Sequence, residues 1–202
     1  GNLALYNNTT ASGNTAVGYQ TLYSNTNGAI NTAVGYQAGY ATTTAYGVNA
    51  LGYQALYANT TGNANNSFGS QALANNTTGS ANVAMGHEAL KANTTASYNT
   101  AIGYQAAYSN TTGANHFFGG YQAGYKNTTG NGNIGIGYGA LHENSTGNGN
   151  TAVGSFDGSA LPALYNNTTG SNNSAFGDGA LASNTTASSN TAVGYQSLYS
   201  NT

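Results

Sequence analysis

The sequence of 202 residues contains no cysteine, no tryptophan and one proline, and only 3% of its residues are charged. Without cysteine there is no disulfide framework, no thiol nucleophile and no cysteine-based metal site. Two lysines and no arginine cannot neutralise a run of phosphates, which excludes an electrostatic nucleic-acid binder. No apolar run approaches the roughly 20 residues that cross a bilayer, so we expect no membrane insertion within this segment.

A repeat of 17 residues runs through the whole sequence instead. The heptapeptide Asn-Thr-Ala-Val-Gly-Tyr-Gln occurs at residues 14–20, 31–37 and 190–196. Its glycine recurs at Gly1, Gly18, Gly35, Gly52, Gly69, Gly86, Gly103, Gly120, Gly137, Gly154, Gly177 and Gly194. We therefore predict a single continuous repeat array over residues 1–202. No atypical repeat closes either end, so we expect the segment to belong to a longer repetitive chain.

Two places depart from the regular spacing. The interval from Gly154 to Gly177 is 23 residues instead of 17, and the extra residues lie near 156–161, just before Pro162. This insertion predicts a loop that leaves one coil. At residues 115–120, Asn-His-Phe-Phe-Gly-Gly, the motif arrives one residue early and a second glycine restores the phase, which predicts a local β-bulge.

Two apolar positions in each repeat predict two short strands. The residue before the glycine is apolar in most copies, as in Val17, Val34 and Leu51, and the fourth residue after it is usually leucine. We expect the residue before the glycine and the one two places earlier to share the inward face, at the strand period of two. The period is too short for a pair of helices and is typical of one coil of a parallel β-solenoid. The predicted fold is an all-β parallel β-solenoid, or β-roll, of about twelve coils with two short strands each.

Stacked coils place identical residues above one another at about 4.8 Å. The asparagine four residues before the glycine is expected to form an amide ladder, which satisfies buried amides without water. Its members are Asn14, Asn31, Asn65, Asn82, Asn99, Asn133, Asn150, Asn173 and Asn190. The tyrosine after the glycine is expected to form ring stacks through Tyr19, Tyr36, Tyr53, Tyr104, Tyr121, Tyr138 and Tyr195, and a second tyrosine column follows four residues later.

The pattern Asn-Thr-Ala-Val-Gly-Tyr-Gln-Ala-Leu-Tyr-Ser-Asn-Thr-Thr-Gly resembles repeats in bacterial and phage proteins described as tail-fibre-like. It is also similar to the Asn-Ser-x-Ala-Ile-Gly repeats in the heads of trimeric autotransporter adhesins. The resemblance covers residues 1–202 and implies a left-handed β-roll on a cell or virion surface, associated with copies of itself as a trimer or filament. The longer repeat and the tyrosine columns depart from the adhesin heads.

Asparagine sequons recur in most coils and allow two interpretations. As N-glycosylation acceptors they would decorate one edge of the stack with sugar. As turn residues, Asn-Thr-Thr segments favour tight turns because asparagine accepts left-handed angles and caps the backbone locally. The sequon asparagines are Asn8, Asn59, Asn76, Asn93, Asn110, Asn127, Asn144, Asn167 and Asn184.

The function that the repeat favours is an extracellular structural shaft of a surface fibre, filament or adhesin, self-associating through coil ends or lateral faces. The alternative is a binding module that presents a repeated face, with tyrosine columns stacking on surface glycans or threonine columns binding ice. The threonine column that includes Thr15 and Thr32 is interrupted by Val83, Phe117 and Ile134.

Residues that could support catalysis are scattered. His87, His116 and His142 occupy different positions of different repeats. Glu88 and Glu143 each follow a histidine, and neighbours along a strand point to opposite faces. We expect no enzyme activity, no catalytic residues, no metal site and no cofactor.

Overall fold

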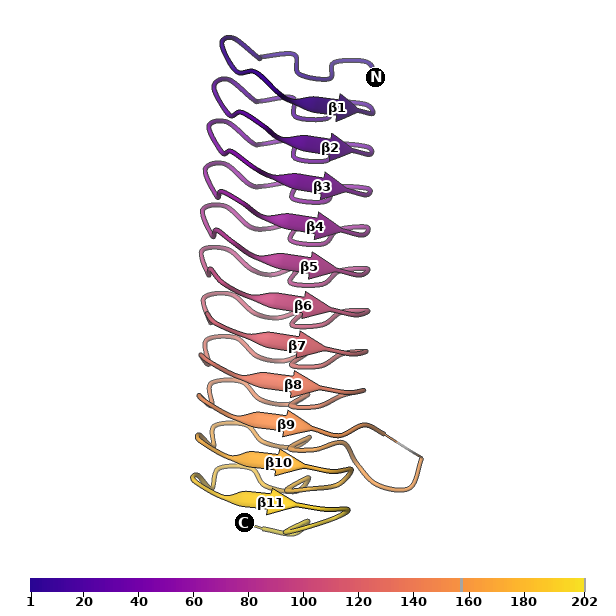
Figure 1. Ribbon diagram of the computed structural model, residues 1–202, viewed down its shortest axis with the longest axis vertical. Coiled ribbons are helices and arrows are strands. Elements are labelled where there is room, and N and C mark those ends of the chain that lie inside the picture. The colour runs from indigo at the N-terminus through magenta and orange to yellow at the C-terminus, as the bar shows by residue number, and fades with distance from the viewer. Residues whose placement is uncertain (157, 202) are drawn as a thin grey trace. The chain divides into compact units, whose positions relative to one another are not determined.

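The computed structural model describes residues 1–156 and 158–201. Within them it contains eleven strands of three residues each and no helix. The chain divides into two compact units, Gly1–Asn99 and Thr100–Thr202, and in each unit the strands pair in parallel. The predicted all-β parallel solenoid is thus confirmed in both units, as Figure 1 shows. The continuity of the array across the boundary between the units stays a prediction.

In the first unit β1 to β5 pair in chain order, each with the equivalent strand of the neighbouring coil. Each residue faces the residue 17 positions later, as Ala33 faces Ala50. The strands are β1 (Thr15–Val17), β2 (Thr32–Val34), β3 (Asn49–Leu51), β4 (Asn66–Phe68) and β5 (Val83–Met85). Identical side chains therefore lie above one another.

The second unit repeats this pairing through both irregular places. Its strands are β6 (Thr100–Ile102), β7 (Phe117–Gly119), β8 (Ile134–Ile136), β9 (Thr151–Val153), β10 (Ser174–Phe176) and β11 (Thr191–Val193). The predicted β-bulge is wrong, because Ala101 faces Phe118 in register and Gly120 keeps its place after the strand. β9 and β10 also pair in register although 23 residues separate them, and the chain between them leaves the stack as a loop (Figure 1).

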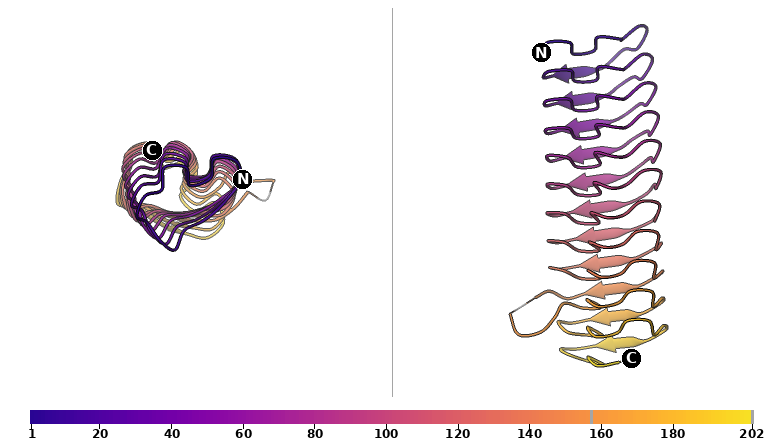
Figure 2. Two further views of the ribbon diagram at one scale, coloured as in Figure 1. Left: turned by 90° about the horizontal axis from the view of Figure 1, so that it is seen from above. Right: turned by 180° about the vertical axis from the view of Figure 1, so that it is seen from behind.

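The second strand predicted for each coil does not form. Its place is taken by a series of turns, here called the left-handed wall, made by the six residues after the glycine that follows a strand and, in the coil with the insertion, by residues 163–166. In the uninterrupted coils the second and fourth of these residues have positive φ, as in Gln54 (50°) and Leu56 (52°), whereas a strand needs φ near −120°. The wall still bonds along the stack, because the N–H of Leu56 donates to the carbonyl of Ala72 (3.0 Å). In Figure 2 the strands form the straight side of the coils, and the side opposite them is indented.

The strands turn a different residue inward than the sequence analysis expected. The middle residue is buried, as in Ala33, Ala50 and Ala84, while the residue before the glycine faces outward, as in Val34 and Leu51. In a strand of three residues the first and third share one face, and here that face is outward. The inward residue must be small because the leucine of the left-handed wall fills the interior. That leucine is fully buried in Leu22, Leu56, Leu73, Leu90, Leu141, Leu164 and Leu181.

One coil of the second unit exchanges the sizes of these core residues. Phe118 stands where other strands carry alanine, and it is fully buried. In the same coil Gly124 stands where most coils carry leucine, and a Cβ there would lie 2.5 Å from the Phe118 ring. Gly135, in the next strand, also leaves room, since its Cβ would lie 3.0 Å from the ring. The apparent early arrival of the motif is therefore a core exchange within an unchanged register.

Candidate functional site

The asparagines predicted to form a ladder line the interior where the chain enters each strand. The Asn31 Oδ1 accepts the backbone N–H of Val48 (2.9 Å), and its Nδ2 donates to the carbonyl of Ala45 (2.8 Å). Amide groups of successive coils also meet, as Asn82 Nδ2 lies 3.1 Å from Asn65 Oδ1. Asn31, Asn65, Asn82, Asn99, Asn133, Asn150 and Asn173 are buried, and Asn14 and Asn190 are half-buried. The column bonds the backbone of the next coil as well as the next amide.

His116 occupies one place in this asparagine column. It is buried, and its Nδ1 accepts the backbone N–H of Asn133 (3.1 Å), as an asparagine oxygen does elsewhere. Burial lowers the pKa of His116 from 6.5 to about 4, against the opposing effect of backbone hydrogen bonds to Gly130 and Asn133. The ring is therefore neutral at pH 7, and its role in the coil is that of a buried hydrogen-bonding group.

The sequon asparagines form a second buried column. Asn76 Nδ2 donates to the Oδ1 of Asn59 in the preceding coil (2.8 Å) and to the carbonyl of Gly79 in its own turn (2.9 Å). Asn59, Asn76, Asn93, Asn110, Asn127, Asn144, Asn167 and Asn184 are all fully buried, and Asn8 at the first coil is half-buried. An N-linked glycan would join the Nδ2 atom that lies inside the fold. The glycosylation interpretation is therefore wrong for these eight residues in the folded units, and the turn interpretation fits them.

The sequence analysis missed this second ladder, although its period of 17 is the same signal that predicted the first. It also missed the one place in the first unit where the ladder is interrupted. Thr42 replaces asparagine there, and both the Asn25 Oδ1 and the Thr42 Oγ1 are buried without a hydrogen-bond partner. A threonine side chain is too short to bridge the two coils.

The tyrosines after the glycines form stacked columns. Tyr19, Tyr36 and Tyr53 follow one another with ring centroids 5.4 and 5.5 Å apart, and Tyr121 and Tyr138 lie 4.8 Å apart. Tyr104 stacks on Tyr121 at 5.3 Å in the same way, and Tyr195 lies exposed near the end of the second unit. The second column runs through Tyr6, Tyr23, Tyr40 and Tyr57, and in the second unit His142 stands between Tyr125 and Tyr165. Rings stacked this closely cover each other's faces and leave mainly edges to solvent.

The outward side of the strands, here called the strand face, carries exposed apolar side chains in both units. In the first unit these are Val17, Val34, Leu51 and Met85. In the second they are Ile102, Phe117, Ile134, Ile136, Phe176 and Val193. No strand residue is charged. Contiguous apolar patches of this kind mark interaction surfaces more often than ordinary solvent-facing surface.

The charged residues make local pairs away from the strands. Lys126 Nζ lies 2.6 Å from Glu143 Oε2, and His142 Nδ1 lies 2.7 Å from Glu143 Oε1. Burial raises the pKa of Glu143, but hydrogen bonds from Lys126 and His142 outweigh it and lower that pKa below its usual range. The expectation that adjacent His142 and Glu143 point apart is wrong, because this segment belongs to the left-handed wall and is not a strand. Within the part of the chain that the structure describes, no three histidine, aspartate or glutamate side chains gather as a metal site.

Comparison of the chain with family models, curated proteins and solved structures finds no match. Its likeness to tail-fibre and adhesin repeats therefore remains one of motif. The fold, a stack of parallel coils, is compatible with repetitive β-roll proteins. Among residues 1–156 and 158–201, no helix is long and apolar enough to cross a bilayer.

Proposed function

We propose that the chain is a structural shaft of an extracellular fibre, filament or adhesin, and that copies associate side by side through the strand face. The observation that carries the proposal is the exposed, uncharged apolar column on the strands of both units. Two such columns have the same spacing of about 4.8 Å, so one copy fits another in register along its length. Burial of apolar surface supplies the free energy, at roughly 25 cal/mol per Å².

The interior supports a mechanical role. Backbone hydrogen bonds, two asparagine columns and the tyrosine stacks all run from coil to coil within each unit. Tension along the stack is then shared among many parallel bonds at every coil. The near absence of charge follows from the same geometry, because like charges stacked at strand spacing repel each other. The motif resemblance supports a location on a cell or virion surface.

Binding of glycans along the tyrosine columns is less well supported by the geometry. Sugars stack on the faces of aromatic rings, and within the columns those faces are covered by neighbouring tyrosines at 4.8 to 5.5 Å. The ice-binding alternative needs a uniform threonine surface, and the strand face places Val83, Phe117 and Ile134 among its threonines. The strand face therefore favours apolar contact between copies.

Sedimentation of the purified chain over a range of concentrations tests the proposal. We expect the unchanged chain to form oligomers or bundles. The pair Ile134→Lys and Ile136→Lys on the strand face should shift it to single chains, because stacked copies cannot bury lysine. Thr129→Lys, an exposed position in the turn, is the matched control and should leave assembly unchanged. Single chains at every concentration, or equal effects of both lysine variants, would overturn the proposal.

A further inference from the structure

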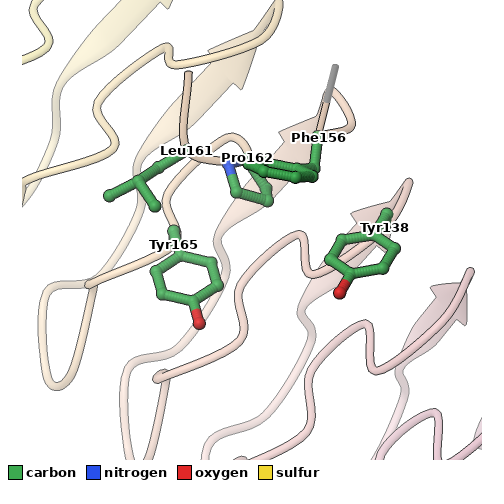
Figure 3. A pocket seen from close by; sticks show the side chains of 5 residues that line it. All are labelled: Tyr138, Phe156, Leu161, Pro162 and Tyr165. Atoms are coloured by element: carbon green, nitrogen blue, oxygen red, sulfur yellow. The ribbon is translucent and has the colours of Figure 1, made fainter. Parts of the chain in front are cut away.

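A cleft of about 180 Å³ opens where the inserted loop meets the stack of the second unit. It is lined by Tyr138, Phe156, Leu161, Pro162 and Tyr165, which Figure 3 shows around one space. Tyr138 follows β8, Tyr165 belongs to the left-handed wall after the insertion, and the other three come from the chain between β9 and Tyr165. The five lining residues that the structure describes include three aromatic rings.

The cleft exists because the aromatic column is opened at this place. Tyr121 and Tyr138 are nearly parallel, at 9°, but Tyr138 and Phe156 are tilted by 34° with centroids 5.7 Å apart. Gly139 contributes as well, because it stands where neighbouring coils carry the glutamine that follows the column tyrosine. A Cβ at Gly139 would lie 3.1 Å from Pro162 Cγ. The column thus departs from parallel stacking here, and Phe156, which is 48% exposed, stands at its edge beside the cleft.

The lining is held in place from both sides. The Asp178 Oδ1 accepts the backbone N–H of Ser155 (2.5 Å) where the loop departs, and the Ser159 hydroxyl lies 3.4 Å from that of Tyr195. The Tyr165 ring is stacked on His142 at 4.9 Å, and His142 is in turn bonded to Glu143. The cleft is thus built on packed residues of several coils.

We propose that this cleft binds one pyranose ring. The C–H face of a pyranose is apolar and packs on aromatic rings, while its hydroxyl groups need polar partners at the edge. The cleft offers both, since Phe156 and Tyr165 line it with aromatic rings, and the phenol hydroxyls of Tyr138 and Tyr165 point to the same side in Figure 3. The cleft volume of about 180 Å³ is small, so we expect it to hold a single ring. This site is separate from the strand face and does not depend on self-association.

Ligand-observed NMR with methyl β-D-galactopyranoside and methyl β-D-glucopyranoside tests the proposal, using p-cresol as an aromatic probe. We expect at least one glycoside to bind the full chain. Phe156→Ala should weaken that binding about 3- to 10-fold, the effect of losing one aromatic contact. The matched control is Phe176→Ala, which removes an equally exposed phenylalanine from the strand face.

Two outcomes would overturn the pyranose site. One is binding of p-cresol with no binding of either glycoside, which would make the cleft a site for aromatic groups. The other is no binding of any probe, or equal losses from Phe156→Ala and Phe176→Ala. Gly139→Gln provides a second variant, because it restores the glutamine of neighbouring coils and should fill the cleft. A negative result here would not affect the assembly proposal, because the sedimentation experiment tests only the strand-face variants.

Discussion

The two sides of a typical coil fill the thin core with residues of opposite size. The strand side keeps its backbone extended and turns a small residue such as Ala50 inward. The left-handed wall turns its backbone through positive φ and buries a large residue such as Leu56. Left-handed φ costs about 1–2 kcal/mol for a residue other than glycine, and leucine burial together with bonds to the next coil offsets this cost. In most coils one side supplies a large core residue and the other a small one, and the coil with Phe118 and Gly124 shows that either side can supply the large one.

The largest expected effect comes from breaking that pairing in the coil that reverses it. Phe118→Ala removes the large residue opposite Gly124 and should destabilise the second unit by about 3–5 kcal/mol. Gly124→Leu alone should also destabilise it, because the Cβ would already lie 2.5 Å from the Phe118 ring. The double variant restores the ordinary coil and should recover most of the loss in urea unfolding. Additive losses would contradict the exchange.

The next largest effect is expected at the glycine that joins the strand to the left-handed wall in each coil. Gly52 has φ of 138°, and a Cβ there would lie 2.5 Å from the Gly69 carbonyl oxygen. Gly52→Ala should therefore destabilise the first unit by about 3 kcal/mol. Gly47→Ala is the control, because Ala64 and Ala81 already occupy the equivalent position and a Cβ at Gly47 would come no closer than 4.0 Å to the Ala64 Cα; it should cost about 1 kcal/mol. Equal unfolding midpoints for the two variants would show that the joint does not require glycine.

Lowering the pH should weaken the second unit through His116. Its pKa is about 4 when folded and near 6.5 when unfolded, so between these values the unfolded chain binds the proton first. Stability is therefore full above pH 6.5 and falls by up to about 3 kcal/mol as the pH drops to 4. His116→Asn, which restores the residue of the column, should flatten this dependence in urea titrations. If the unfolding free energy of His116→Asn depends on pH as strongly as that of the unchanged chain, other groups cause the acid sensitivity.

Thr42→Asn should stabilise the first unit. The new amide can donate to the buried Asn25 Oδ1, which has no partner, and complete the turn column between Asn25 and Asn59. Satisfying a buried polar group contributes about 1–2 kcal/mol. Thr43→Asn, one residue along the same turn, is the control, and it should not raise the melting temperature because its side chain lies outside the buried column. A melting temperature that falls with Thr42→Asn would show that the site has no room for the amide.

The smallest effect concerns an exposed residue with positive φ. Ile30 has φ of 59° and is β-branched, while the equivalent residues Gly13 and Gly47 are glycines. Ile30→Asn should stabilise the first unit by about 0.5–1 kcal/mol, because asparagine accepts left-handed angles more readily. Ile30→Val keeps the branching and should give no gain. If both variants melt alike, relief of backbone strain is not the cause.

Much of this architecture was predictable from particular residues. The glycine period predicted stacked parallel coils, and the leucine four residues after most of these glycines was correctly placed in the core, as in Leu56 and Leu73. The inward side of the strand was predicted wrongly, because Val34 and Leu51 look like core residues when the opposite wall is unknown. The sequons were equally ambiguous, since Asn76 reads as a glycan acceptor until the turn places its Nδ2 in the interior.

The order of the amino acids alone is enough to give the repeat length, the stacking of like residues and the low charge that such stacking requires. These are consequences of periodicity, which is visible in one dimension. Only the tertiary structure decided which strand face points inward, which asparagines are buried, and where an inserted loop opens the aromatic column into a cleft. Each of these depends on contacts across the thin core or with the next coil. The spacing of residues along the chain does not reveal which side chains make those contacts.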